Sequence, residues 1–217
     1  MAKLTGPILS FGARGSIGKT IVASKWRGVA YARQHVVPAN PRTTAQQAVR
    51  TLFAYLREMW KLAPSEVAPA WDSFAQGRPF TGMNKFIGEN VRVMNGEVDM
   101  NNFIGSPGSK GGPAPVSVAA VTGGASGEVD VTVTVPTIPS GWAITKVVAI
   151  GFPDANPTGI FLGPFVQATD ATAPYQPDLT GLGSAVPCQV AAWIVWQKPD
   201  GSAAYSVSIT DQATSAA

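Results

Sequence analysis

The spacing of hydrophobic residues changes along the chain, from a helical period in the first half to a period of two in the last third. Between residues 45 and 62, apolar side chains recur every three or four positions, at Val49, Leu52, Phe53, Leu56, Met59 and Trp60. This spacing predicts an amphipathic helix over residues 45–62, with Thr43 or Thr44 as its cap. Shorter helices are expected near residues 71–74 and 82–94.

The segment before this helix has the composition of an extended chain. Strand-forming residues are spread over residues 16–37, and Arg27-Gly28 lies between two apolar runs, as a turn would. Pro38 and Pro41 then end the extended segment, because proline has no backbone N–H to donate. These residues predict a β-hairpin or arm ahead of the helix.

After residue 115 the hydrophobic pattern alternates. Val129, Val131 and Val133 are separated by polar residues, which indicates a strand with one buried face. Further strands are expected at residues 116–122, 142–152, 158–165, 175–180, 187–197 and 203–210. About seven short strands in roughly 100 residues is the pattern of an immunoglobulin-like β-sandwich.

A stretch rich in glycine, serine and proline separates the two patterns. Residues 96–115 contain turn formers without periodicity, which indicates a linker. The predicted fold class is therefore α+β, with three parts. A basic arm, hairpin and helical assembly domain occupies residues 1–95, the linker residues 96–115, and an immunoglobulin-like or fibronectin III-like β-sandwich residues 116–217.

The charges are divided unevenly along the chain, although the net charge is only +3. Residues 1–62 hold ten Lys/Arg and one acid, whereas residues 116–217 hold two basic residues and seven acids. Only 13% of all residues are charged, against about 25% in an average globular chain. The opposite charges indicate two parts with different partners, and the weakly charged surface favours permanent assembly.

The sequence shows no pattern for secretion or membrane insertion. Gly6 and Pro7 interrupt the start before an apolar leader can form, so we expect no secretion signal. No apolar run approaches the roughly 18 residues that span a bilayer, so we expect no membrane insertion. Cys188 is the only cysteine, which excludes an internal disulfide and indicates folding in a reducing cytoplasm. A protein made there can still leave the cell as part of a particle.

Candidate catalytic residues are sparse. Residues 13–20 fit a permissive form of the phosphate-binding P-loop, but a P-loop needs a helix after it, and residues 21–28 have the pattern of a strand ending in a turn. We therefore interpret residues 13–20 as a glycine-rich turn. His35 is the only histidine and is expected on the arm surface, and Cys188 is expected to be a buried structural thiol. We expect no catalytic residue, no cofactor, no metal site and no enzyme activity.

The basic first third of the chain gives the strongest functional indication. Its arginines are interleaved with Trp26, Tyr31, Tyr55 and Trp60, which suits phosphate contacts and base stacking. The same cations suit docking onto an acidic protein surface, and the helix aromatics lie at core spacing. We therefore favour protein assembly over nucleic-acid binding. The predicted assembly contacts are Lys19, Trp26, Arg27, Tyr31, Arg33, Arg42, Arg50 and Arg57.

Residues 12–90 contain a series of short motifs. They are a glycine-rich start at Gly15–Gly18, the turn Trp26–Gly28, the pair Tyr31–Arg33, the motif Asn40–Thr43 and the helix start Gln46-Gln47, followed by Ala70–Ala75 and Thr81–Phe86. This series resembles a family of uncharacterised structural proteins of tailed bacteriophages and prophages, which share a glycine-rich start, a Trp-Lys/Arg-Gly turn, Tyr-x-Arg, Asn-Pro-x-Thr and a glutamine-rich helix start. The resemblance implies membership of a virion.

The last third resembles a fibronectin type III or immunoglobulin-like module. The stretch from Leu179 to Trp193 is similar to the segment that leads into strand F of such modules. There a tyrosine usually lies six residues after a leucine that corresponds to Leu182. This chain has Cys188 in place of that tyrosine, so the resemblance leaves fibronectin type III and other sandwiches as alternatives. Modules of this kind decorate phage capsids and tails.

Together these features predict a structural or accessory component of a tailed-bacteriophage particle, in the capsid, neck or tail. The N-terminal domain is expected to dock onto other virion proteins and onto its own copies, while the sandwich projects. Two alternatives are kept. One is nucleic-acid binding by the basic third, and the other is binding of a host-surface glycan by the sandwich through Trp193 or Trp196.

Overall fold

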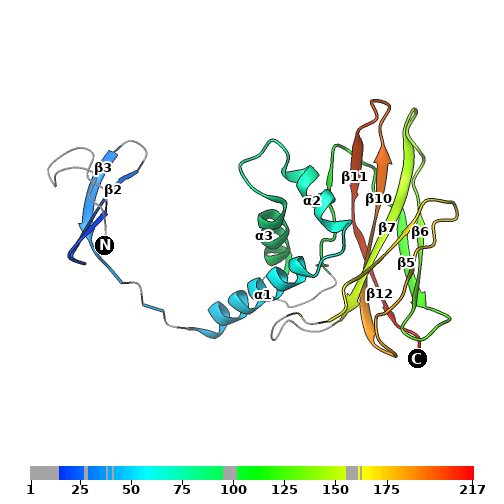
Figure 1. Ribbon diagram of the computed structural model, residues 1–217, viewed down its shortest axis with the longest axis horizontal. Coiled ribbons are helices and arrows are strands. Elements are labelled where there is room, and N and C mark those ends of the chain that lie inside the picture. The colour runs from blue at the N-terminus through cyan, green and yellow to red at the C-terminus, as the bar shows by residue number, and fades with distance from the viewer. Residues whose placement is uncertain are drawn as a thin grey trace. The chain divides into compact units, whose positions relative to one another are not determined.

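The protein is described by a computed structural model that covers residues 15–26, 29–37, 39–40, 42–94, 102–154, 161 and 163–217 (Figure 1). The chain forms two compact units, Met1–Thr43 and Thr44–Ala217, which are described separately. The described residues form three helices and twelve strands, and all strand pairs in the three sheets are antiparallel. This confirms the α+β class expected from the sequence.

The first unit contains a three-stranded sheet in the order β1-β2-β3, made of Gly15–Ile17, Ile21–Trp26 and Val29–Gln34. A turn at Gly18 and Lys19 joins β1 to β2, and both residues have the positive φ angles that such a turn needs (52° and 56°). Trp26 pairs with Val29 across the next connection. A strand therefore follows the glycine-rich segment, as the sequence predicts, whereas a P-loop requires a helix at this position.

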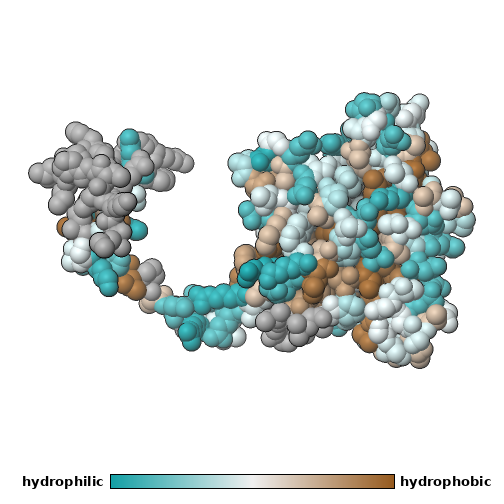
Figure 2. All heavy atoms as spheres, viewed as in Figure 1, coloured by the Kyte–Doolittle hydropathy of each residue, from teal (hydrophilic) through white to brown (hydrophobic). Residues whose placement is uncertain are grey.

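The second unit begins with three helices: α1 (Thr44–Lys61), α2 (Val67–Ala75) and α3 (Gly82–Met94). The first confirms the helix predicted at 45–62. Its predicted inner face is correct in part: Leu52, Leu56 and Met59 are buried and Trp60 packs against the same core, whereas Val49 and Phe53 are exposed. The residues of its first two turns are exposed, and Figure 2 shows hydrophilic residues there. Packing of an amphipathic face thus stabilises only the later turns of α1.

Two antiparallel sheets complete the second unit. The larger has the order β4-β11-β10-β7-β8, with β12 also paired to β10; the smaller has the order β5-β6-β9. The strands of the larger sheet are β4 (Pro107–Ser109), β7 (Ala143–Pro153), β8 (Val166–Asp170), β10 (Pro187–Gln197), β11 (Ala203–Val207) and β12 (Ile209–Thr214). Those of the smaller are β5 (Ser117–Thr122), β6 (Val129–Thr134) and β9 (Asp178–Leu179).

The larger sheet is covered on both faces, so the unit has three layers (Figure 1). Successive residues of a strand point to opposite faces. On β10, Trp193 joins the core shared with the helices, whereas Ile194 joins the core shared with β5, β6 and β9. On β7, Ile150 and Ala149 divide in the same way. The helices are therefore one layer of this unit.

This arrangement corrects the predicted domain boundaries of 1–95, 96–115 and 116–217. The boundary between the compact units lies between Thr43 and Thr44 in the sequence. The helices belong to the second unit because their inner face is buried against β7 and β10. A sandwich starting at residue 116 would expose the face of the larger sheet that the helices cover. The predicted boundary rested on the glycine-, serine- and proline-rich composition of residues 96–115, which was interpreted as a linker.

The predicted linker is also corrected where the structure describes it, at residues 102–115. Phe103 is 2% exposed, and β4 pairs with β11. The indole N–H of Trp71 donates to the Gly105 carbonyl at 2.9 Å. A Cβ at Gly112 would lie 2.7 Å from the backbone of Tyr205, so a glycine there permits close packing. The composition of this segment reflects tight packing against β11.

The predicted strands differ from the observed ones at three places. No strand occurs at the described residues of 158–165, and β8 begins at Val166 instead. The strand expected at 175–180 is shortened to the two residues of β9. The one expected at 203–210 is divided into β11 and β12 around Ser208, whose hydroxyl accepts hydrogen bonds from the backbone N–H groups of Gly105 and Ser106.

Candidate functional site

Three of the predicted assembly residues lie in the described part of the small N-terminal sheet. Tyr31 and Arg33, two positions apart on β3, share one face of the sheet and are both exposed. Lys19 is exposed in the turn between β1 and β2. The side chain of Trp26 and the residue Arg27 lie outside the described part of the chain.

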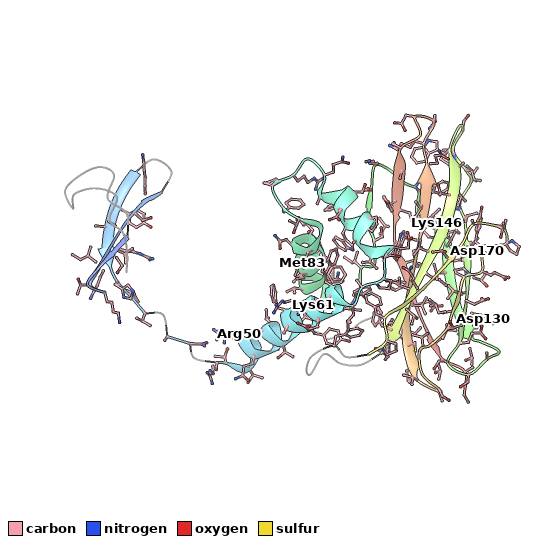
Figure 3. All side chains as sticks on the ribbon, viewed as in Figure 1. Arg50, Lys61, Met83, Asp130, Lys146 and Asp170 are labelled. Carbon is pink, nitrogen blue, oxygen red and sulfur yellow. The ribbon has the colours of Figure 1, made fainter. Side chains whose placement is uncertain are left out.

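The remaining predicted contacts belong partly to the other unit. Arg42 is exposed just before α1, and its backbone has a φ of 48°. Arg50 and Arg57 are exposed on α1, with Arg50 in the early half of the helix (Figure 3). The eight predicted residues are thus divided between the two compact units.

The N-terminal unit has an unusual surface. Residues 1–43 contain seven Lys/Arg and no Asp or Glu. None of the side chains described between residues 15 and 43 is buried, and Val36 and Val37 are 68% and 80% exposed. A small isolated sheet is marginal in water unless a hydrophobic face is covered. The described part of this unit therefore presents both cationic and apolar groups at its surface.

The candidate reactive residues have structural environments. The thiol of Cys188 is buried and donates to the carbonyl of Val186 at 3.2 Å. Burial raises the pKa of this thiol, which disfavours the nucleophilic thiolate. His35 is half-buried, and its backbone N–H donates to the Thr20 carbonyl at 2.7 Å. Within the described ranges, no group of three or more His, Cys, Asp or Glu residues is arranged to hold a metal ion.

The two tryptophans suggested for glycan binding are both fully buried, so that expectation is wrong for these residues. Trp193 packs in the core beneath the helices, and Trp196 packs in the core between the two sheets. The indole N–H of Trp196 donates to the Pro113 carbonyl at 3.0 Å. Both residues are buried because β10 is a central strand with a layer on each side.

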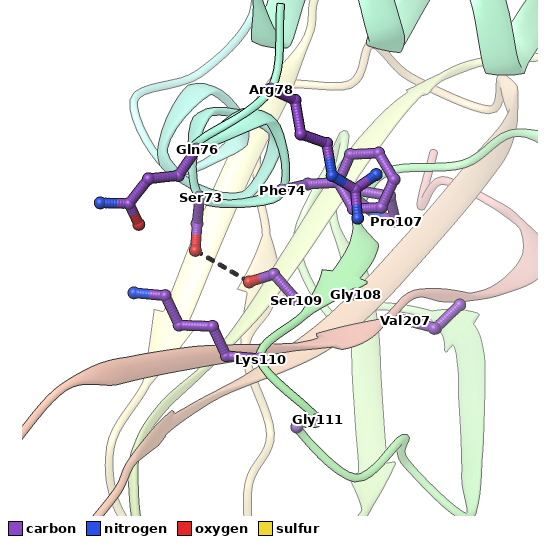
Figure 4. Close-up of a pocket in the computed structure, with 11 residues that line it drawn as sticks. Ser73, Phe74, Gln76, Arg78, Pro107, Gly108, Ser109, Lys110, Gly111 and Val207 are labelled. Carbon is purple, nitrogen blue, oxygen red and sulfur yellow. Dashed lines mark hydrogen bonds between the residues drawn. The ribbon is translucent and has the colours of Figure 1, made fainter. Parts of the chain in front are cut away.

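The second unit has a hollow of about 510 Å³ beside the edge strand β4 (Figure 4). It is formed where the C-terminal end of α2 meets β4 and the turn that follows this strand. The hydroxyl oxygens of Ser73 and Ser109 are 2.9 Å apart and join the two walls. The lining residues are Ser73, Phe74, Gln76, Arg78, Pro107, Gly108, Ser109, Lys110, Gly111, Gly112 and Val207.

Two cations border this hollow. The guanidinium of Arg78 lies over the ring of Phe74, 4.6 Å from its centroid, and 5.9 Å from the ring of Phe80. Lys110 follows β4 and has a φ of 54°, a left-handed conformation that non-glycine residues rarely adopt. This hollow was not predicted from the sequence, because Lys110 lies in the predicted linker and Arg78 in a turn, where no periodic pattern marks a site. No spacing rule connects two cations from such distant segments.

Among the described residues, no helix is both long enough and apolar enough to cross a bilayer.

Comparison with known proteins finds matches among solved structures. No protein-family model matches the chain, and no curated protein sequence matches it. Among solved structures, the chain is similar to a computationally redesigned β-sandwich protein, at 13% sequence identity and a TM-score of 0.33. The match covers 48% of this chain and 91% of the other.

Proposed function

We propose that this protein is a structural component of a tailed-bacteriophage particle, with the N-terminal unit as its docking element. The motifs over residues 12–90 that resemble phage structural proteins support the assignment to a virion. In this proposal the unit Met1–Thr43 binds copies of the chain or a neighbouring particle protein. The unit Thr44–Ala217 carries the displayed surface.

The observation that carries the proposal is the surface of the N-terminal unit. Its described residues include exposed apolar side chains without a buried core, and residues 1–43 have cations without a single acid. An isolated sheet of this kind gains stability when another surface covers it. The absence of acids favours an acidic partner, because attraction between opposite charges steers association.

We further propose that the two-sheet part of the larger unit is a variant of the immunoglobulin-like sandwich. The smaller sheet packs through Val129, Val131 and Val133 against alternate residues of β7 and β10, as the inner faces of such a sandwich do. The helical layer on the outer face of the larger sheet distinguishes the variant. This addition leaves the smaller sheet as the displayed face of the sandwich.

The test of the docking proposal is the solution mass of the full chain beside that of residues 44–217. Light scattering in moderate salt should give a defined oligomer for the full chain and a monomer for the shortened one. If both are monomers, self-assembly is excluded, and docking on an acidic particle protein is tested by adding that protein. If both are oligomers of the same size, the N-terminal unit is not the assembly element.

Nucleic-acid binding is the second candidate, and the seven cations of residues 1–43 favour it. A protein that neutralises several phosphates is retained on DNA in a strongly salt-dependent way. We expect the full chain to elute from immobilised DNA at low salt, because phosphate contacts without base stacking weaken steeply as the salt concentration rises. Retention at physiological salt that disappears when residues 1–43 are removed would favour the nucleic-acid function over assembly.

A further inference from the structure

The hollow between α2 and β4 brings together two cations, Arg78 and Lys110, for which the described residues show no ion pair. The ion pairs formed by the described residues use Lys61, Lys85, Arg92 and Lys146. Arg78 and Lys110 belong to turns after α2 and after β4, more than 30 positions apart in the sequence. Figure 4 shows them on opposite sides of the hydrogen-bonded pair Ser73 and Ser109.

The neighbouring carboxylates are directed elsewhere. Asp72 packs against Gly82, where α3 begins, so closely that an added Cβ at Gly82 would collide with its carboxylate. Asp200 accepts a hydrogen bond from the backbone N–H of Ser202 at 2.8 Å. The pKa of Asp200 is lowered mainly by its hydrogen bonds from Ser202, while Lys198 and Lys110 add smaller effects. The described lining of the hollow therefore holds two cations and no carboxylate.

The side chains around the two cations supply the other contacts that an anion needs. Phe74 lies beneath the guanidinium of Arg78, and this cation–π contact holds the guanidinium in place at the border of the hollow. The hydroxyls of Ser73 and Ser109 and the amide of Gln76 are hydrogen-bond donors on the same walls. A guanidinium forms paired hydrogen bonds with two oxygens of a phosphate or carboxylate, and an ammonium adds a point charge.

We propose that this hollow binds an oxyanion group, a phosphate or a carboxylate carried by a larger molecule, between Arg78 and Lys110. The site is independent of the docking function proposed for the N-terminal unit, since all of its residues belong to Thr44–Ala217. Arg78 binds the group through its guanidinium, and Lys110 closes the opposite side. The Gln76 amide donates to a remaining oxygen, as does whichever of the Ser73 and Ser109 hydroxyls is not donating to the other.

The test is a titration of residues 44–217, which contain both hydrophobic cores. The amide resonances in NMR spectra report the binding. One titration uses inorganic phosphate and a second uses glucuronate, a sugar carboxylate, each at constant ionic strength set with chloride. We expect saturable shifts at Ser73 and at Gly108–Gly111 with at least one probe. Response to phosphate alone indicates a phosphorylated ligand, and response to glucuronate alone indicates an acidic sugar.

The double variant Arg78→Gln, Lys110→Gln should weaken the response about tenfold or more, because the charged hydrogen bonds to the anion are lost. The variant Lys61→Gln, Arg92→Gln is the matched control, since it removes two cations from the same unit at a distance from the hollow. It should leave the response unchanged. The proposal is overturned if neither probe gives saturable shifts, or if both double variants respond as the unaltered protein does.

Discussion

The indole nitrogen of Trp71 lies 2.9 Å from the carbonyl oxygen of Gly105, and this buried hydrogen bond ties α2 to the segment that leads into β4. Trp71 is fully buried, and its ring also meets Phe86 of α3 edge to face at 5.5 Å. A single side chain therefore links two helices to the larger sheet. The helical layer depends on this residue both for packing and for satisfying a buried carbonyl.

The substitution Trp71→Phe should destabilise residues 44–217 by about 1–3 kcal/mol, because the Gly105 carbonyl loses its buried partner. Urea unfolding measures the change. Trp60→Phe is the matched control: Trp60 belongs to the same layer but is only partly buried, so its replacement should cost less. Equal effects of the two substitutions would show that the hydrogen bond adds nothing beyond packing.

Removal of the helices should prevent independent folding of the two-sheet part. A chain of residues 116–217 would expose Val148, Ile150, Phe152 and Trp193, which are at most 1% exposed in the complete unit. Such a contiguous apolar face leads to association. We expect this fragment to aggregate and to bind a hydrophobic dye, whereas residues 44–217 unfold in one cooperative transition. A monomeric fragment with the thermal stability of the longer chain would contradict the three-layer description.

Asp130 should destabilise the protein at neutral pH. It lies opposite Asp178 on neighbouring strands, and its pKa is raised first by burial and then by the charges of Glu128 and Asp178. The folded state therefore binds this proton more tightly than the unfolded chain, so the ionised carboxylate costs stability above the raised pKa. We expect Asp130→Asn to gain about 0.2–1 kcal/mol at pH 7, as for relief of a like-charged cross-strand pair. The gain should disappear at pH 3.

Asp170 provides the opposite case. Its pKa is lowered mainly by the hydrogen bond from the backbone N–H of Gln176, with further hydrogen bonds from Thr172. The ionised form therefore stabilises the fold above the pKa of the unfolded chain, and this stability is lost as the pH falls through the lowered value. Asp170→Asn should lower the melting temperature at pH 7 and have a progressively smaller effect in acid. A constant difference at all pH values would exclude the charge as the cause.

The sequence pattern located both β6 and β10, but it indicated the covered face of β6 and not the second covered face of β10. In β6, Val129, Val131 and Val133 alternate with polar residues, and the observed burial follows the same alternation. In β10, the nine residues from Cys188 to Trp196 are all buried, including Gln189. The uninterrupted run around Trp193 and Trp196 was the available indication of a second covering layer, since strands buried on both faces lose the alternation.

The candidate sites were predictable only in part. The excess of cations in residues 1–43 and the amphipathic face of α1 follow directly from residue types and spacing. The hollow beside β4 does not, because Ser73 and Ser109 meet only when the chain folds α2 against β4. Lys110 likewise comes from a glycine-rich turn whose packing against β11 depends on the whole sheet. Long-range contacts of this kind have no local pattern in the sequence.

The most direct test of the central claim, that the basic N-terminal unit is the assembly element, compares two charge variants of the full chain by light scattering. In one, Lys19, Lys25 and Arg33 of the small sheet are replaced by glutamine; in the other, Lys61, Arg92 and Lys198 of the larger unit are replaced in the same way. The account predicts that the first variant has the 22.5 kDa mass of a single chain, whereas the second keeps the mass of the unaltered assembly. Equal masses for the two variants would contradict it.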